Sequence, residues 1–507
     1  MISRALFLLI ALLAAPTLAF CLFCMQPGPG GIAALAFAAA TLGAFAGRVD
    51  WRAPVEAGRT AVCLLIGLAL ALIAGGGHFF YQTDDWTIRD AVLLDLIRNP
   101  WPVPYAWDGH APLTMLRAPL GMYLTPALVG KALGERAGDL AMLVQNGLMF
   151  GLILRVFMGQ ADSRRAGWIT AAFFVLFSGV DILPWGLLRL QGASIAMMPH
   201  IEVWTGRFQY SSHVTEMLWS PNHALPGWCF VAAYEAWRRG KAPATALAVV
   251  FAACLLWSPL AALGALPFLI LAGLRDLGER RLTARGFAEA TLAAISVVPV
   301  AIYLTRDAGA VSQRWLFRED GFVLSYLMFL AFELGPFVAL LARDPVTRAT
   351  KGWERAEILL ILALLALIPF YLIGDANDFA MRVSIPALAL LALRAAGAFD
   401  RAWRFDRLAN QRWVLAALAL AAITPLSEIG RNLVFAQSAM SACNVVEAFK
   451  AGPATTLGAD GQAVLYVADA DAFEKMSWLF RLPSSAPERR VRPTCYPPAR
   501  RFVFSDP

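Results

Sequence analysis

Long apolar segments alternate with short polar connections along most of this 507-residue chain. The apolar segments repeat at lengths of about 17–25 residues, which an α-helix needs to cross a hydrocarbon core of ~30 Å. This pattern predicts an all-α polytopic membrane protein with about 13 transmembrane helices. The predicted spans cover roughly 4–25, 30–47, 60–81, 139–158, 167–188, 221–237, 243–258, 259–275, 286–305, 321–342, 356–374, 383–399 and 413–430.

The composition agrees with a membrane protein. Hydrophobic residues make up 59% of the chain and charged residues 16%, and the mean hydropathy is +0.59. Soluble domains carry about a quarter charged residues, so the composition excludes an ordinary soluble domain. The formal charge of +7 is spread over short loops. It therefore indicates membrane topology and gives no case for nucleic-acid binding.

Basic residues in the short loops predict the orientation. Arg48, Arg52 and Arg59 mark a cytoplasmic loop under the positive-inside rule, and later basic loops agree with it. The N-terminus is then inside, the C-terminus is outside, and the chain is expected in a bacterial-type cytoplasmic (inner) membrane. The first segment could pass for a signal peptide, but more spans follow directly, so we expect a retained first helix.

Segment 118–134 is apolar, yet counting it as a span would invert every later loop. We therefore expect it to lie on or dip into the outer face. Three substantial outer loops remain, at 82–138, 189–220 and 306–320. These assignments divide the chain into an N-terminal hairpin (1–59), a transmembrane domain (60–436) and an extracytoplasmic tail (437–507).

The tail loses the long apolar runs. A helix near 438–450 followed by short strand-like runs at 463–468 and 501–504 predicts a small α/β cap. Cys443 and Cys495 both lie in this external tail. They either form a disulfide or remain apart, and the sequence leaves both alternatives open.

An acidic pair, Asp84-Asp85, stands where the predicted third span ends. A carboxylate in that place can act as a general base, a metal ligand or a helix cap. The structural alternative is an N-cap, because the amphipathic helical pattern 86–99 follows at once. One acid can cap while the other reacts, so the two interpretations are compatible.

The surroundings favour a functional role. The aromatic, proline-rich run 100–105 follows the helix, then Trp107, then the sequence 116–124 that leads into the surface segment. This order resembles the first extracytoplasmic loop of the GT-C superfamily of integral membrane glycosyltransferases. The specific likeness covers only about 78–160, an additional hairpin precedes the acidic loop, and the tail matches no subfamily.

The resemblance implies a GT-C-like fold and transfer of a sugar from a polyprenyl-phosphate carrier to a lipid, glycan or protein acceptor. It implies Asp85 as general base, with Asp84 as the alternative. Arg382 is the leading candidate for binding the phosphate; the alternative is an interfacial arginine paired with Asp378. The substrate-binding candidates are Trp86, Arg382, Trp101, Trp107, Arg117, Tyr123, His223 and Arg207.

No cofactor is certain from the sequence. The second outer loop carries four His and Glu residues that can bind a divalent ion, in a spacing that matches no established site, and loop hydrogen bonding is the alternative. These weak metal candidates are His200, Glu202, His213 and Glu216.

Two other functions remain open, a transporter or flippase and a membrane scaffold that only binds. Transporters tend to show internal repeats and charges at mid-membrane, which this sequence lacks apart from Asp181 near one span end. The enzyme hypothesis predicts that Asp85, Arg382 and the second outer loop line one cavity.

Overall fold

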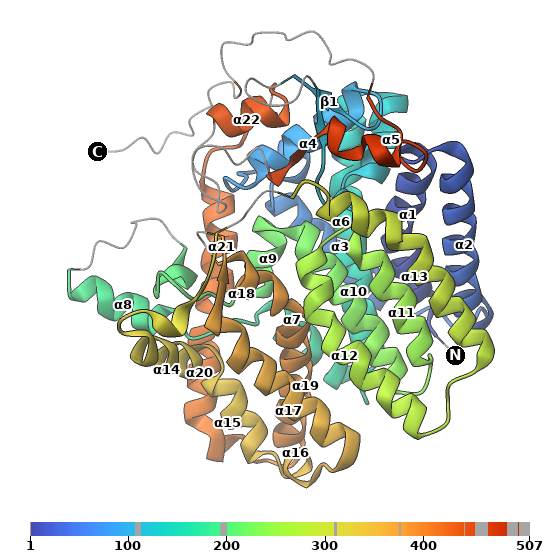
Figure 1. The fold of residues 1–507 in the computed structure, drawn as a ribbon. Helices are drawn as coiled ribbons and strands as arrows, with labels where there is room; N and C mark the ends of the chain where they lie inside the picture. The colour runs from blue at the N-terminus through green and yellow to red at the C-terminus, as the bar shows by residue number, and fades with distance from the viewer. Residues whose placement is uncertain are drawn as a thin grey trace.

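The computed structural model describes residues 2–106, 113–192, 200–308, 312–374, 377–440, 442–451, 465–483 and 495, and it is mostly helical (Figure 1). The α-helices are α1 (Arg4–Phe23), α2 (Pro27–Phe45), α3 (Ala57–Ile73), α4 (Trp86–Arg98), α5 (Leu124–Leu133), α6 (Glu135–Gly159), α7 (Arg164–Val175), α8 (Ile182–Leu190), α9 (His213–Trp219), α10 (Pro221–Arg238), α11 (Ala244–Leu255), α12 (Pro259–Gly278), α13 (Ala284–Thr305), α14 (Phe322–Glu333), α15 (Gly335–Arg343), α16 (Pro345–Ala349), α17 (Gly352–Leu367), α18 (Asp378–Val383), α19 (Ile385–Arg404), α20 (Arg412–Ala421), α21 (Ile423–Val434) and α22 (Val445–Ala451). The strands are β1 (Pro104–Tyr105), β2 (Thr114–Leu116), β3 (Gln313–Trp315), β4 (Tyr371–Ile373) and β5 (Val467–Asp469).

Within the described residues, 6 helices are long and apolar enough to cross a membrane, or up to 7 if the bent pair α14–α15 counts as one span. The chain is therefore a polytopic, helical membrane protein by length and composition, and the 13 expected full spans are not reached. The long helices are Arg4–Phe23, Pro27–Arg48, Glu135–Gly159, Pro259–Gly278, Ala284–Thr305 and Arg412–Val434.

Several predicted spans are shorter or broken. Helix α3 ends at Ile73 because Gly75 and Gly77 adopt φ of 90° and 72°, which suits glycine and ends the helix. Predicted span 167–188 divides into α7 and α8. A Cβ on Gly179, in the gap, would lie 2.1 Å from a carboxylate oxygen of Glu333, so this close approach requires glycine.

Two other predicted spans met the same limit. Predicted span 321–342 is a helix pair, α14 and α15, bent by 55°. Predicted span 356–374 leaves the helix at Leu367 and continues into β4, which pairs antiparallel with β3 of the third outer loop. Segment 118–134 agrees with the prediction that it is not a span, because its helix α5 has 10 residues and is about 15 Å long, too short to cross a bilayer.

Small residues allow α3 and α6 to pack closely. A Cβ on Gly67 would lie 2.2 Å from the Gly147 carbonyl oxygen and 2.5 Å from the Gly151 nitrogen. Such glycine contacts let two helix backbones approach in a membrane. This contact holds the helix that leads into Asp84-Asp85 against the long helix α6.

The variant Gly67→Ala should lower the free energy of unfolding by ~1–3 kcal/mol, because the added methyl overpacks the α3–α6 contact. Gly58→Ala, in the same helix with no atom within 4 Å of the added Cβ, is the matched control. Thermal unfolding in detergent measures both. Equal midpoints for the two variants would contradict the close contact.

The first outer loop and the tail form one structure at the upper end of Figure 1, where α4, α5, β1 and α22 lie together. Strands β1, β2 and β5 form an antiparallel sheet in that order. The expected helix is present as α22 and part of the expected strand 463–468 as β5, but the tail is not a separate cap. The expected strand 501–504 lies outside the described residues.

A disulfide bond also links two parts of the tail. Cys443 and Cys495 form a disulfide, which decides between the two alternatives left open by the sequence. The backbone nitrogen of Val445, next to it, donates a hydrogen bond of 2.9 Å to Asp95 of α4. The tail is thus attached to the helix that follows the acidic pair.

Candidate functional site

A cavity of about 380 Å³ lies between the first outer loop, the helix ends beneath it and the tail. Four of the residues singled out in the sequence line it: Asp85, Arg117, His223 and Arg382. The complete lining is Asp85, Ile88, Arg89, Arg117, Pro119, His223, Pro259, Leu260, Leu304, Ala308, Ile373, Asp378, Arg382, Phe449, Leu465 and Tyr466.

Asp85 occupies the N-cap position immediately before α4, but its side chain makes no capping hydrogen bond. Its oxygen Oδ2 accepts a hydrogen bond of 3.2 Å from Arg89 Nη2, one helical turn on. Among the residues that the structure describes, Oδ1 accepts none. The side chain is buried at the cavity wall, so its free oxygen is available to a ligand there.

Asp84 is outside the cavity lining. Its backbone carbonyl accepts a hydrogen bond from Thr87, and its side chain reaches the surface. Desolvation by the surrounding protein, and then the charge of Asp85, raise the pKa of its carboxyl, while Arg431 opposes them. The two aspartates therefore have different surroundings, and only Asp85 faces the cavity.

Arg382 lies in the short helix α18, just before the start of α19. Its Nη1 donates to both carboxylate oxygens of Glu216, at 3.2 and 3.1 Å, and to Ser220 Oγ at 2.5 Å. Its Nε lies 3.7 Å from Asp378 Oδ1 without a hydrogen bond. The guanidinium is 4% exposed and lines the cavity, so it does not point into lipid.

The described part of the second outer loop contributes no residue to the cavity lining, contrary to the prediction. It supports the cavity from behind, because Glu216 and Ser220 hold Arg382. His223, at the start of α10, does line the cavity, and its Nδ1 lies 2.7 Å from Ser258 Oγ.

The tail completes the wall. Arg117 donates from Nη1 to the Leu304 carbonyl and from Nη2 to the Leu465 carbonyl, both at 3.0 Å. It thereby joins the first outer loop, α13 and the segment before β5. Tyr466 and Phe449 line the cavity with ring centroids 5.2 Å apart. An apolar, aromatic surface thus faces the charged groups.

Four predicted substrate-binding residues lie outside the lining. Trp86 is 1% exposed and donates to the Leu218 carbonyl, so it anchors α4 in the packing and presents no ring to the cavity. Trp101 donates to the Leu96 carbonyl and is buried similarly. Tyr123 is buried, and Arg207 donates to the Asp320 carbonyl at the surface. Trp107 lies outside the described residues.

The metal candidates do not form a metal site. Among the described residues, no group of three or more His, Cys, Asp or Glu side chains could hold an ion. Glu216 is occupied by Arg382, and Glu202 accepts from Ser212 and Thr215. These contacts are the loop hydrogen bonding that the sequence left as the alternative.

The two histidines of that set have separate surroundings. His213 Nδ1 lies 2.7 Å from the Phe174 carbonyl within a cluster of aromatic rings. His200 Nδ1 lies 3.3 Å from Glu428 Oε1. Burial lowers the pKa of His200, but the hydrogen bond and charge of Glu428 outweigh it and raise the pKa.

Sequence reasoning missed three cavity residues. Arg89 lies four residues after Asp85, a spacing that brings side chains together on a helix and was the available signal. Asp378 was considered only as a partner of Arg382, although it lines the cavity itself. Tyr466 comes from the tail, and nothing in the sequence indicated that the tail returns to this site.

Asp378 gives the site a pH dependence. Burial raises the pKa of its carboxyl to about 6, Arg382 opposes this, and Asp85 adds to it. An unfolded aspartate titrates near pH ~3.9, so the folded state holds its proton more tightly. Stability from this group is present below about pH 4 and is lost as the pH rises through 6.

The variant Asp378→Asn should therefore be more stable than the wild type at pH 8 and unfold at a higher temperature. Its free energy of unfolding should be greater by at most ~3 kcal/mol. The gap should narrow toward pH 4 and close below about pH 3, where the wild-type carboxyl is protonated in both the folded and the unfolded state. Asp471→Asn, an exposed acid of the tail, is the control. A gap that widens toward pH 4 would show that the sign is wrong.

Comparisons with protein-family models, with curated proteins and with solved structures find no match for this chain.

Proposed function

We propose that this chain is a GT-C-type glycosyltransferase that moves a sugar from a polyprenyl-phosphate donor to an acceptor on the extracytoplasmic face. The observation that carries the proposal is the cavity of about 380 Å³ that brings Asp85 together with Arg89, Arg117 and Arg382. Its volume falls in the range of small-molecule sites, ~300–1,000 Å³. It lies where the first outer loop meets the helix ends, which is where this proposal puts the head group of a lipid-linked donor.

The reaction needs a base. The acceptor hydroxyl oxygen forms a bond to the anomeric carbon, the bond from that carbon to the phosphate oxygen breaks, and the hydroxyl proton passes to a carboxylate. Asp85 offers Oδ1 for that proton, since Arg89 occupies Oδ2. The paired guanidinium also fixes the carboxylate in place, so its orientation requires little rearrangement.

The leaving polyprenyl phosphate gains negative charge. Arg382 supports this charge from a buried position, where a fixed cation acts more strongly than in water. Its Nε lacks a hydrogen-bond partner among the described residues, and a phosphate oxygen would provide one. The Tyr466 and Phe449 rings supply a surface for the apolar face of a sugar or for the first isoprene unit.

The test is a transfer assay with purified protein in proteoliposomes and a panel of radiolabelled polyprenyl-phosphate monosaccharides. We expect one donor to yield labelled product and unlabelled polyprenyl phosphate to inhibit it competitively. Transfer from nucleotide sugars but from none of the lipid-linked donors would refute the donor class.

A transporter is the second candidate, because two broken helices meet inside the bundle. Helix α7 ends at Val175 and α8 begins at Ile182, and the Val180 nitrogen in this gap donates to the Phe332 carbonyl at the α14–α15 bend. Discontinuous helices are a feature of transporter sites. Movement of an intact fluorescent polyprenyl-phosphate probe across the vesicle, without a transfer product, would favour this candidate.

A further inference from the structure

A second cavity, of about 550 Å³, lies at the opposite end of the helices that carry the first. Helix α10 has His223 of the first cavity near its start and Glu235 of the second near its end; twelve residues of α-helix span ~18 Å. Similarly, Arg382 precedes α19 and Arg394 lies within it. The second cavity is thus separate from the proposed catalytic site.

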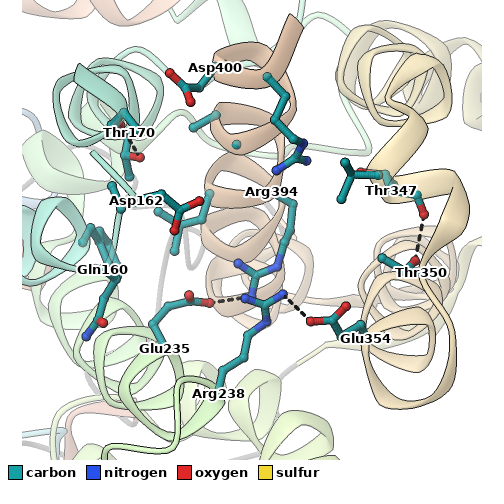
Figure 2. Close-up of a pocket in the computed structure, with 18 of the residues that line it drawn as sticks. Gln160, Asp162, Thr170, Glu235, Arg238, Thr347, Thr350, Glu354, Arg394 and Asp400 are labelled. Carbon is teal, nitrogen blue, oxygen red and sulfur yellow. Dashed lines mark hydrogen bonds and ion pairs between the residues drawn. The ribbon is translucent and has the colours of Figure 1, made fainter. Parts of the chain in front are cut away.

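Figure 2 shows charged and hydroxyl side chains from several helices converging on this second cavity. Its arginines differ in how firmly they are held. Arg394 Nε donates to Glu357 and Arg394 Nη2 to Glu235, both at 2.5 Å, and both carboxylates are buried. Arg394 is therefore held by two buried carboxylates and serves the packing of α10, α17 and α19.

Arg238 and Arg239 are held loosely. Arg238 Nη2 lies 3.4 Å from Glu354 Oε1, and its buried Nε lies 3.3 Å from Glu357 Oε2 in an ion pair without a hydrogen bond. Arg239 reaches Asp162 Oδ1 at 3.4 and 3.5 Å. The Glu354 and Asp162 side chains are 56% and 72% exposed, so these two contacts are long, solvated and weak, whereas Glu357 is buried and also accepts from Arg394.

Two adjacent guanidinium groups with loosely engaged donors suit a phosphate, which accepts bidentate hydrogen bonds from arginine. The cavity also contains carboxylates, which disfavour a ligand with a second negative charge. Asp162 and Glu354 can instead accept hydrogen bonds from hydroxyl groups, and Thr347 and Thr350 line the same wall. The lining therefore fits a singly charged phosphodiester that carries hydroxyl groups.

The cavity's position favours a lipid as the source of this group. It lies beside the end of α6, a helix long and apolar enough to cross a membrane, and Phe157, Leu393 and Phe405 give it an apolar side that suits the glycerol and first methylenes. Basic pockets between helices on the side that carries the basic loops bind lipid head groups. We propose that this second cavity binds a phosphatidylglycerol-type head group through Arg238 and Arg239.

Native mass spectrometry of the full-length protein, purified from micelles with equal dioleoyl phosphatidylglycerol and dioleoyl phosphatidylcholine, tests this site. The wild type should retain phosphatidylglycerol over phosphatidylcholine with a preference of roughly tenfold, and Arg238→Gln/Arg239→Gln should lose that preference. Arg280→Gln/Arg281→Gln changes an adjacent, exposed arginine pair at the end of α12 and should keep it. Equal retention by the first double variant and the wild type would overturn the proposal.

The single variant Arg239→Gln separates binding from folding, because Arg239 contacts only exposed Asp162 among the described residues. It should keep the wild-type unfolding midpoint in phosphatidylcholine and still weaken retention of phosphatidylglycerol. Soluble glycerophosphoglycerol carries the same phosphodiester head group, so it distinguishes a lipid ligand from a free ester. Competition by glycerophosphoglycerol only at a far higher concentration than phosphatidylglycerol supports a lipid site. If glycerophosphoglycerol binds as tightly as the lipid, the lipid proposal is wrong and the free ester is the ligand.

Discussion

The variant Asp85→Asn should lose sugar transfer by on the order of 10²–10⁴-fold while it keeps the fold, because removing a general base costs that much. The amide oxygen that replaces Oδ2 still accepts the hydrogen bond from Arg89 Nη2, so the cavity wall is preserved. An amide cannot take the proton of the acceptor hydroxyl. The loss should therefore appear in kcat, with little change in the KM for the donor.

Asp84→Asn is the matched control, because the same substitution one residue earlier falls outside the cavity lining. Transfer by both variants is measured in the proteoliposome assay, with the unfolding midpoint as a check on folding. We expect Asp84→Asn to retain transfer within a few-fold of the wild type. Loss in Asp84→Asn with retention in Asp85→Asn would exchange their roles, and retention in both would remove the acidic pair from the mechanism.

The sequence predicted the local features of the outer loop well. The pattern after Asp85 predicted a helix over 86–99, and α4 occupies Trp86–Arg98. The positive-inside argument predicted that 118–134 is not a span, and α5 is a 10-residue helix. These predictions depend on short-range periodicity and charge, which act within a few turns of the chain.

The breaks in the predicted spans were beyond such reasoning. An apolar run reads as a continuous helix when nothing local interrupts it. The interruption before Asp181 depends on contact with α14, where Gly179 admits the Glu333 side chain. The bend at α14–α15 lies at the same contact, since Glu333 is the last residue of α14. Long-range packing of this kind overrides the hydropathy pattern.

Long-range packing also explains why the sequence predicted only part of the cavity. Asp85 and Arg382 stand beside span ends, where hydropathy marks them, and the structure brings them into one lining. The aromatic candidates were chosen by composition, and Trp86 and Trp101 use their rings for packing. Tyr466 and Leu465 reach the site through pairing of β5 with β2, across about 350 residues of chain, which periodicity does not reveal.

Arg382 is the second residue whose replacement should have a large effect. Truncating it alone is a poor test, because Glu216, which is 2% exposed, would lose its cation, and breaking a buried pair costs ~3–5 kcal/mol. The double variant Arg382→Gln/Glu216→Gln removes both charges together and lets the two amides hydrogen-bond to each other. It should fold with an unfolding midpoint near that of the wild type.

Transfer by this double variant should still fall by on the order of 10²-fold or more, because the leaving phosphate loses its buried cation. The proteoliposome assay should show a lower kcat and a weaker inhibition by free polyprenyl phosphate. Arg207→Gln is the control, since Arg207 stands at the surface outside the lining and pairs with exposed groups of the third outer loop. Unchanged transfer in the double variant, or equal losses in the double variant and in Arg207→Gln, would place the phosphate elsewhere. Arg89 and Arg117 would then be the remaining cations of the cavity able to receive it.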